Sequence, residues 1–448
     1  MTRHHSPEPS VFRSGIYSLL EKGAGMAFNL GTAMLLLRML DKAAFAAWSI
    51  FILLAYFVEM GRSGLLQNGL VRSLATRKNQ PDEQASIGTA ALILNVAYSI
   101  VSCVLIGSSI DWICRQYQVP MLPEMLPAYF LTIFFMAFGS HSYFVQQAHL
   151  EFRGVFWMAV CYRGIPFLWV FSCWMTHYPM ALWQFSAAML TGTLLAAVIT
   201  GWYARSFLFF NCKADWQWVK NLSAYGKYVL GTNLSTMLYK NIDKLTLGQL
   251  LGPVAFSLYD AAWRVTQLVE APAFSIAAVV FPKSAEKMAL EGTTGVKQLY
   301  ERSVGATLAI ILPFVVFVIL FAEPIMLVFA GKEYGEAANL LRLTAFFGLF
   351  MPYAVQFGTA LDATGKPGIN LAYTFFTAAL NLALSFFFIR FFGLYGAAYA
   401  TLTGYALSFV LMQHYLHRYF GVNAVHAWRY IPGFYQAGWR MLQNRMKK

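Results

Sequence analysis

Residues 305–329 have the sequence GATLAIILPFVVFVILFAEPIMLVF, with Glu323 as their one charged residue. A helix that crosses a lipid bilayer needs about 20 consecutive, mostly apolar residues. This stretch meets that length, and lipid-embedded helices satisfy their own backbone hydrogen bonds. The stretch therefore predicts a membrane-spanning helix, and the rest of the chain repeats the pattern.

The same rule predicts an all-α polytopic membrane protein with about 12 transmembrane helices. The expected spans are 15–37, 43–61, 86–109, 125–148, 155–176, 182–204, 224–250, 255–280, 305–329, 338–361, 367–389 and 394–417. The loops between them are short, so no large outer loop is expected to house a catalytic site. We therefore expect a protein that is not an enzyme.

The composition supports this class. Hydrophobic residues make up 58% of the chain and charged residues 12%, whereas a soluble domain averages roughly 25% charged residues. The formal charge of +13 would favour nucleic acid in a soluble protein, but cytoplasmic loops of membrane proteins carry excess Lys and Arg. We expect no nucleic-acid partner, no metal and no cofactor, and no cleavable signal at the polar start of the chain.

The charges of the loops predict the orientation. With the N-terminus in the cytoplasm, the cytoplasmic segments hold 22 Lys and Arg, including Arg62, Arg72 and Arg77, and the opposite loops hold five. This asymmetry predicts that both termini are cytoplasmic. The basic tail, 419–448, contains Trp428 and Trp439 and is expected to lie as an amphipathic segment on the anionic leaflet.

A moderate internal repeat relates the two halves of the chain. At an offset of 211 residues, Ala44-Phe45 aligns with Ala255-Phe256 and Val58-Glu59 with Val269-Glu270. Six expected helices separate the copies, so both copies run in the same direction, as in a parallel repeat. We predict two six-helix lobes around a central cavity. Their limits are 1–204 and 223–418, with a cytoplasmic linker at 205–222.

Six basic residues lie inside or at the edges of the expected spans, where a charge costs roughly 3 kcal/mol or more. They are Lys22, Arg163, Lys240, Lys244, Arg264 and Arg342. Around Lys22, helical spacing places five residues on one face: Ser18, Lys22, Gly25, Asn29 and Thr32. The repeat-related face carries Val229, Asn233, Thr236, Lys240 and Asp243. Two polar faces at the same phase predict that both line one central cavity.

Purely structural alternatives stay open at these positions. Lys240 precedes Asp243 by three residues, and Asp260 and Arg264 have the i, i+4 spacing of an ion pair. Polar residues also join helices without any further role. Among the acids, Glu270 lies next to Pro272, where a kink frees backbone carbonyls. Glu270, its repeat equivalent Glu59, and Asp243 are therefore candidates for ion coupling, with a buried hydrogen bond as the alternative.

Several motifs resemble those of one known family. Lys22-Gly23, Leu37-Arg38-Met39-Leu40, Phe45 and Trp48 resemble the first two helices of polysaccharide and O-antigen flippases, although Asp41 and Ala46 replace two glycines of the usual pattern. The second half resembles the same family through Asp243 to Gly248, Leu251-Gly252, Tyr259-Asp260-Ala261-Ala262 and Phe281-Pro282. These flippases belong to the multidrug/oligosaccharidyl-lipid/polysaccharide (MOP) exporter superfamily.

The resemblance implies translocation of a polyprenyl diphosphate-linked oligosaccharide across the bacterial inner membrane by alternating access, for cell-surface polysaccharide biosynthesis. It implies a cationic cavity in which Lys22 and Arg264 match cations on the first and eighth helices. Lys240, Lys244 and Arg163 complete the candidate diphosphate site, lined by Ser18, Asn29, Asn233 and Thr236. Membrane lipids, a glycan polymerase and chain-length machinery are the implied partners.

Two other functions compete with flipping. A cation-coupled multidrug exporter of the same superfamily shares the lobes but should favour acids in its cavity, and the six bases within spans argue against it. A membrane glycan polymerase or ligase needs a large outer loop, which the short loops do not provide.

We expect Lys22→Ala or Arg264→Ala to abolish complementation in a host that lacks its own flippase, because each removes a cation proposed to hold the diphosphate. Membrane expression should stay intact and is measured in parallel with surface glycan. Normal glycan display in both variants would refute these roles.

Overall fold

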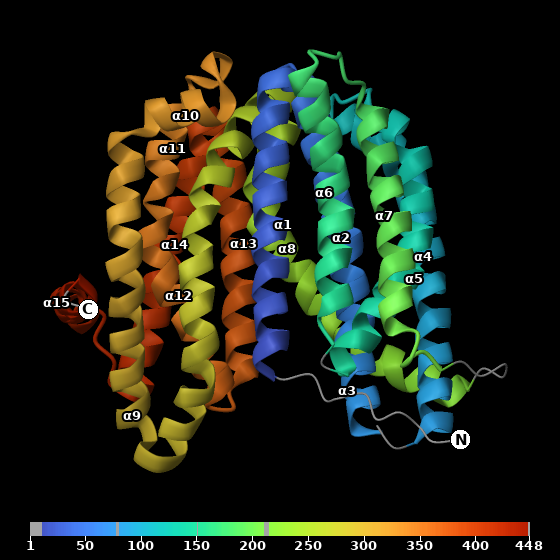
Figure 1. Ribbon diagram of the computed structural model, residues 1–448. Coiled ribbons are helices and arrows are strands. Elements are labelled where there is room, and N and C mark those ends of the chain that lie inside the picture. The colour runs from blue at the N-terminus through green and yellow to red at the C-terminus, as the bar shows by residue number, and fades with distance from the viewer. Residues whose placement is uncertain (1–10, 78–79, 150, 210–214, 447–448) are drawn as a thin grey trace. The chain divides into compact units, whose positions relative to one another are not determined.

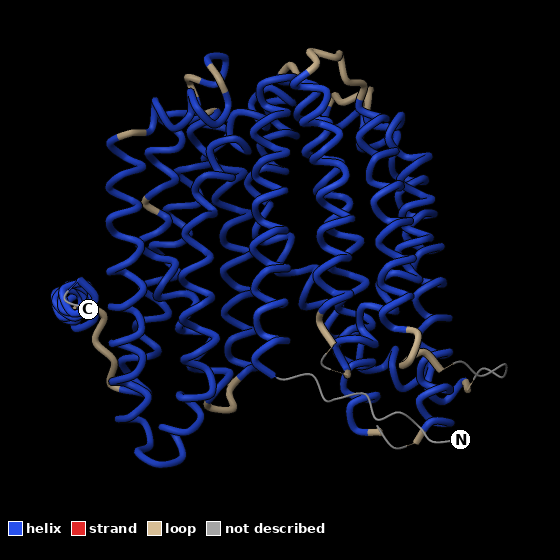
Figure 2. Tube along the Cα trace, viewed as in Figure 1, coloured by secondary structure: helices blue, strands red, loops and turns tan. Residues whose placement is uncertain are grey.

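The computed structural model describes residues 11–77, 80–149, 151–209 and 215–446. Nearly all of these residues are helical, and the described part of the chain contains no strand. Figure 2 shows long helices joined by short loops. The all-α prediction is therefore confirmed.

The chain divides into two compact units, unit 1 (Met1–Met237) and unit 2 (Leu238–Lys448). The division lies inside α8 (Trp216–Thr266), so the first part of this helix belongs to unit 1 and the rest to unit 2. Each unit is described by itself, and the predicted lobe limits stay a prediction.

Unit 1 contains a set of long helices that run side by side in Figure 1. Its elements before α8 are α1 (Val11–Met39), α2 (Lys42–Arg62), the π-helical turn η1 (Ser63–Gln67), α3 (Asn68–Thr76), α4 (Pro81–Tyr117), the 3-10 turn η2 (Leu122–Met125), α5 (Leu126–Ala148), α6 (Arg153–Met175) and α7 (Leu182–Ala204). Local signals set the ends. The Asp41 carboxylate accepts the Ala44 N–H at 2.8 Å and caps α2, and Pro81 occupies the first turn of α4.

The start of α8 packs against η1 by close backbone approach. A Cβ at Gly226 would lie 2.0 Å from the Leu65 carbonyl oxygen, and one at Gly64 would lie 2.8 Å from the Leu230 Cα. Next to them, the Asn233 side-chain amide donates to the Met60 carbonyl at 3.1 Å. Glycine at both positions is therefore what lets the two segments touch.

Unit 2 contains the rest of α8 and the following elements: η3 (Gln267–Val269), α9 (Glu270–Leu320), α10 (Ala322–Ala330), η4 (Lys332–Tyr334), α11 (Ala337–Ala345), α12 (Phe347–Ala363), α13 (Pro367–Phe392), α14 (Leu394–Phe420) and α15 (His426–Met446). Two glycines with positive φ interrupt the long helices: Gly252 in α8 (φ 83°) and Gly292 in α9 (φ 64°). Glycine adopts such a φ without the steric penalty of a Cβ. The break at Gly252 lies between the predicted spans 224–250 and 255–280.

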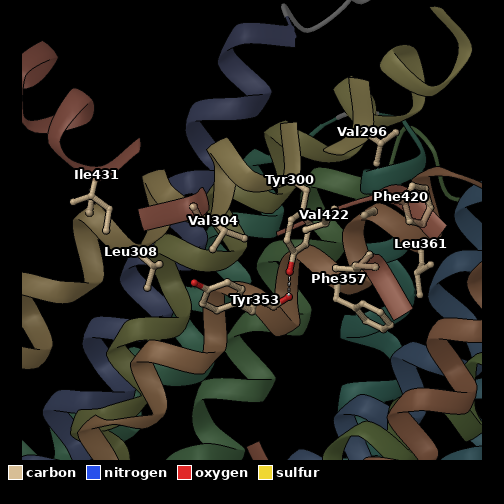
Figure 3. Packing of buried hydrophobic residues seen from close by; sticks show 14 residues of the cluster. Val296, Tyr300, Val304, Leu308, Tyr353, Phe357, Leu361, Phe420, Val422 and Ile431 are labelled. Carbon is tan, nitrogen blue, oxygen red and sulfur yellow. Dashed lines mark hydrogen bonds between the residues drawn. The ribbon is translucent and has the colours of Figure 1, made fainter. Parts of the chain in front are cut away.

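A buried apolar cluster joins α9, α12, α14 and the C-terminal segment (Figure 3). Tyr300, Tyr353 and Phe357 supply its aromatic centre, and Val422 and Ile431 bring the tail into it. The Tyr300 hydroxyl donates to the Tyr353 carbonyl at 3.3 Å. The start of the C-terminal segment, at Val422 and Ile431, thus packs into the core of unit 2.

Among the described residues, nine helical segments are long and apolar enough to cross a membrane, or ten if the bent pair α11–α12 forms one span. One segment, Trp216–Phe281, has 66 residues and includes the break at Gly252. At about 1.5 Å per residue its length along the chain is about 100 Å. The hydrocarbon layer is only about 30 Å thick. Helix α1, which carries Glu21, Lys22 and Asn29, is outside this set. The protein is a multi-pass membrane protein, and the twelve-span, two-lobe arrangement stays a prediction.

Two predicted spans were wrong in detail. The stretch 305–329 is not one helix, because α9 ends at Leu320 and α10 begins anew at Ala322, just before Glu323 and Pro324. Proline inside a helix removes a backbone hydrogen bond and favours a break or kink, whereas it fits the first turn of a new helix. The span 338–361 is two helices, α11 and α12, which meet at 41° next to Phe346.

We expect Gly226→Ala to lower the midpoint of thermal unfolding of the purified protein, because the new methyl meets the Leu65 backbone, and overpacking typically costs about 1–3 kcal/mol. The matched control is Gly231→Ala, one and a half turns along the same helix, where a Cβ would meet nothing within 4 Å. That control should leave the midpoint unchanged or raise it. Equal midpoints for both variants would contradict the close packing of η1 and α8.

Candidate functional site

The predicted site residues of unit 2 lie in three polar clusters, and the first of them joins α8, α13 and α14. At its centre is Asp243, which is buried with 5% of its surface exposed. Its carboxylate accepts hydrogen bonds from three neutral side chains: Asn381 Nδ2 (3.0 Å), Ser385 Oγ (2.5 Å) and Thr401 Oγ1 (2.6 Å). A negative group is thus held among neutral donors inside the apolar span.

The same cluster is rich in oxygen atoms. The Tyr259 hydroxyl lies 3.1 Å from Thr401 Oγ1, and Asn381 Oδ1 is buried with no hydrogen-bond partner. Buried polar atoms normally have partners, and carboxylate, amide and hydroxyl oxygens are the ligands that hard cations prefer. The cluster can therefore take a proton on Asp243 or a small cation among these oxygens.

A second cluster joins Lys244, which directly follows Asp243, to the part of α8 after the break at Gly252. Asp260 is buried and pairs with Lys244 Nζ through one carboxylate oxygen and with Arg264 Nε at 2.8 Å through the other. Only 10% of the Lys244 side chain and 16% of the Arg264 side chain are exposed. The ion-pair alternative for Arg264 is therefore confirmed, and Lys244 is enclosed in the same pair.

Lys240 has a different and more accessible partner. Its Nζ lies 2.9 Å from Glu270 Oε2, with 34% and 20% of the two side chains exposed, and 5.4 Å from the Phe274 ring centroid. The alternative pairing of Lys240 with Asp243 was wrong, because Asp243 faces α13 and α14 instead. Lys240 is thus the cation of unit 2 that solvent reaches most readily among those predicted to bind substrate.

In unit 1, the predicted cations lie near the middle of α1, which spans Val11–Met39. The Lys22 side chain is exposed. The Arg163 guanidinium of α6 covers Gly25 so closely that a Cβ there would lie 2.1 Å from its Nη1. Asn29 is exposed, whereas Gly25 and Thr32 are buried, so the predicted polar face of helix 15–37 divides between an exposed side and a side packed on α6. The Ser18 side chain lies outside the described part.

The remaining predicted residues of unit 1 make local contacts. Glu59 accepts a hydrogen bond from the Tyr162 hydroxyl of α6. Asn233 binds the Met60 carbonyl, and the Thr236 hydroxyl donates to the Thr232 carbonyl of its own helix at 2.9 Å. The contacts of Glu59 and Asn233 join separate helices, that of Thr236 lies within α8, and the shared central cavity stays a prediction.

The count of loop charges wrongly placed Arg62 in a cytoplasmic loop. It is 2% exposed, and it donates to Asn95 Oδ1 (2.8 Å), Ser99 Oγ (3.1 Å) and the Ile133 carbonyl (2.9 Å). The apolar sequence continues through η1 and α3 to Leu74. That continuation was the signal that Arg62 lies within a span.

Sequence reasoning also missed the partners of Asp243. Asn381 and Ser385 are spaced i, i+4 in the apolar segment 367–389, and that polar pair was a usable signal for a shared helix face. Thr401 offered no comparable signal, because single threonines occur throughout spans.

The sequence pattern of the family described as "Polysaccharide biosynthesis protein" matches residues 35–339. The chain belongs to this family. The resemblance predicted from the sequence, to polysaccharide flippases of the MOP superfamily, is confirmed. The matched region includes Asp243, Asp260 and Arg264 but ends before Asn381.

Relatives agree with the family. The chain is 18% identical over 420 residues to a putative O-antigen transporter of Shigella flexneri, covering 90% of this chain and 97% of that protein. It is 25% identical over 211 residues to the probable low-salt glycan biosynthesis flippase Agl15 of Haloferax volcanii, covering 47% of this chain and 45% of that one. The match to Agl15 therefore spans less than half of either protein.

Solved structures show the fold. A multidrug resistance MATE family transporter of the MOP superfamily, in an inward-facing conformation, matches with a TM-score of 0.74 at 16% identity, covering 90% of this chain and 98% of that one. The lipid II flippase MurJ matches with a TM-score of 0.73 at 14% identity, covering 90% and 87%. Because drug exporters and lipid flippases share this fold, the fold does not choose between them.

We expect Asp260→Asn to destabilise the protein strongly, because it removes the carboxylate that pairs with the enclosed Lys244 and Arg264. Removing one partner of a buried pair typically costs about 3–5 kcal/mol. Glu270→Gln is the matched control, since the more exposed pair with Lys240 should lose about 1 kcal/mol or less. The yield of monodisperse protein and its unfolding midpoint in detergent measure the difference, and equal losses would show that both pairs are equally enclosed.

Proposed function

We propose that the protein moves a polyprenyl diphosphate-linked oligosaccharide across the bacterial inner membrane by alternating access, for cell-surface polysaccharide biosynthesis. The observation that carries this proposal is the family match over residues 35–339, supported by relatives named as an O-antigen transporter and a glycan flippase. The protein acts as a transporter and not as an enzyme. Both termini lie in the cytoplasm, and a glycan polymerase with its chain-length machinery takes up the product.

The diphosphate requires cations, because a bare anion does not enter hydrocarbon. In unit 1 the proposed cations are Lys22, which is exposed, and Arg163. In unit 2 the proposed cation is Lys240, whose side chain is more exposed than those of Lys244 and Arg264. Arg264 and Lys244 act indirectly, since Asp260 already neutralises part of their charge. An outside-positive membrane potential favours outward movement of an anion by about 2.3 kcal/mol per charge per 100 mV.

The pair of Lys240 and Glu270 suggests how binding is made reversible. In the structure Glu270 occupies the position beside Lys240 that a phosphate oxygen would take. Substrate and Glu270 therefore compete for one ammonium group, and a ligand shifts an equilibrium only through such differential contacts. Release of substrate is favoured when Glu270 returns to Lys240.

The oxygen cluster at Asp243 is the proposed coupling site. Asp243 lies three residues after Lys240 on α8, so a proton or sodium ion bound there adds positive charge close to Lys240 on the same helix. Filling and emptying this site would change how strongly α8 attracts an anion. Asp243 was among the residues predicted for ion coupling, and its burial beside the oxygens of Asn381 and Thr401 supports that role.

A cation-coupled drug exporter is the second candidate, and one observation favours it. In unit 2 the cations Lys240, Lys244 and Arg264 all pair with acids, so the argument from a basic cavity is weaker than the sequence alone suggested. Reconstitution separates the two functions. Purified protein in liposomes should translocate a fluorescent lipid-linked oligosaccharide, whereas uptake of an organic cation without lipid flipping would overturn the proposal.

We expect Ser385→Ala to shift the proton gradient that gives half-maximal transport by about tenfold or more, because it removes one of three donors that stabilise the charged carboxylate of Asp243, and a charged hydrogen bond is worth roughly 1.5–3 kcal/mol. Ser303→Ala is the control, since its buried hydroxyl donates only to the Tyr300 carbonyl of its own helix at 2.9 Å. The assay is flipping in liposomes at several imposed gradients. An unchanged gradient dependence for Ser385→Ala would remove Asp243 from the coupling site.

A further inference from the structure

The C-terminal helix α15 has three faces of different composition. At about 100° per residue, Ala427, Ile431 and Phe434 form one stripe, and this stripe packs into the core of unit 2. Trp428, Tyr435 and Trp439 form a second stripe about 100° away, and their side chains are 43%, 47% and 62% exposed.

The third stripe of α15 is polar. It carries Arg429, Gln436 and, by position in the helix, Arg440, and the described side chains Arg429 and Gln436 are exposed. The surrounding sequence strengthens this basic character, because no Asp or Glu follows Asp362 in the chain. The apolar stripe of α15 packs on the protein, and the aromatic and basic stripes lie on its other sides. This arrangement is expected for a helix that lies at a membrane surface and packs against the rest of the protein.

The contacts of α15 and of the residues just before it determine where along α9 the helix lies. The Asn423 N–H donates to Glu301 Oε1 at 2.9 Å, and the Tyr435 hydroxyl donates to the Ala309 carbonyl at 2.7 Å. Between them, a Cβ at Gly305 would lie 2.5 Å from the Ala427 carbonyl oxygen. Helix α15 therefore crosses α9 within the short stretch from Glu301 to Ala309.

That stretch is where the apolar part of α9 begins. Residues 303–320 carry no charge, whereas Glu301 and Arg302 precede them. Eighteen residues at about 1.5 Å each extend about 27 Å, close to the hydrocarbon thickness of about 30 Å. In Figure 1, α15 is seen along its axis while α9, α12 and α14 run up the picture. The helix thus lies across the bundle at one edge of its apolar zone.

We infer that α15 lies in the head-group layer of one leaflet and binds anionic phospholipid through its basic stripe, in which Arg429 is exposed, and through the aromatic stripe of Trp428, Tyr435 and Trp439. Aromatic side chains prefer the head-group level, and basic residues near the surface are attracted to anionic lipids. Since α15 is joined to α9 through Glu301 and Gly305, the lipid also stabilises this junction. The inference does not depend on which substrate the protein carries.

The test compares full-length protein in nanodiscs of phosphatidylcholine alone or with about 30% phosphatidylglycerol. Hydrogen–deuterium exchange of the amides of residues 426–446 should be roughly fivefold slower with phosphatidylglycerol. The double variant Arg429→Gln with Arg440→Gln should lose this difference. The charge-retaining variant Arg429→Lys with Arg440→Lys should keep most of it, which separates lost charge from misfolding.

The control removes two charges from α9 on either side of Gly292, Lys283→Gln with Lys297→Gln, and should behave as wild type. The inference is overturned if exchange in wild-type α15 is the same in both lipids, because protein contacts alone would then hold the helix. It is also overturned if the control loses the lipid effect to the same extent, because the effect would then reflect total charge and not α15.

Discussion

The ion pairs around Asp260 are the constraint on which the rest of unit 2 depends. Lys244 and Arg264 are held inside a span, where an uncompensated charge is costly, and both pair with the one carboxylate of Asp260, which offsets part of their charge. Because Asp260 pairs with Lys244, the part of α8 after the break at Gly252 is held to the turn that contains Lys244. It also leaves Lys240 and Asp243, on the neighbouring turns, as the charged groups whose partners can change.

The two neighbouring groups differ in a way that matters for transport. Asp243 is enclosed by neutral donors and an unsatisfied amide oxygen, an environment suited to a small cation. Lys240 is partly exposed and paired with a carboxylate, an environment suited to exchange with a larger anion. Because both lie on α8, the proposed coupling would let occupation of one site act on the other without a long-range pathway.

The sequence predicted the fold class well, because a span of about 20 apolar residues leaves few alternatives in lipid. It failed where helices break or continue for local reasons, as at Phe321, where Glu323 and Pro324 begin a new helix, and at Arg62, where the apolar stretch continues past a charge. For the site, spacing within one helix correctly suggested the pair of Asp260 and Arg264. It could not reveal Thr401 next to Asp243 or Glu270 next to Lys240, since these contacts depend on how separate helices pack.

The central claim is that Glu270 and a diphosphate compete for Lys240. The most direct measurement is equilibrium binding of a polyprenyl diphosphate to the purified, full-length protein and two variants. Glu270→Gln should bind more tightly than wild type, by up to about tenfold, or about 1.4 kcal/mol, and Lys240→Gln should bind more weakly. Weaker binding by both variants, or no change in either, would contradict the competition.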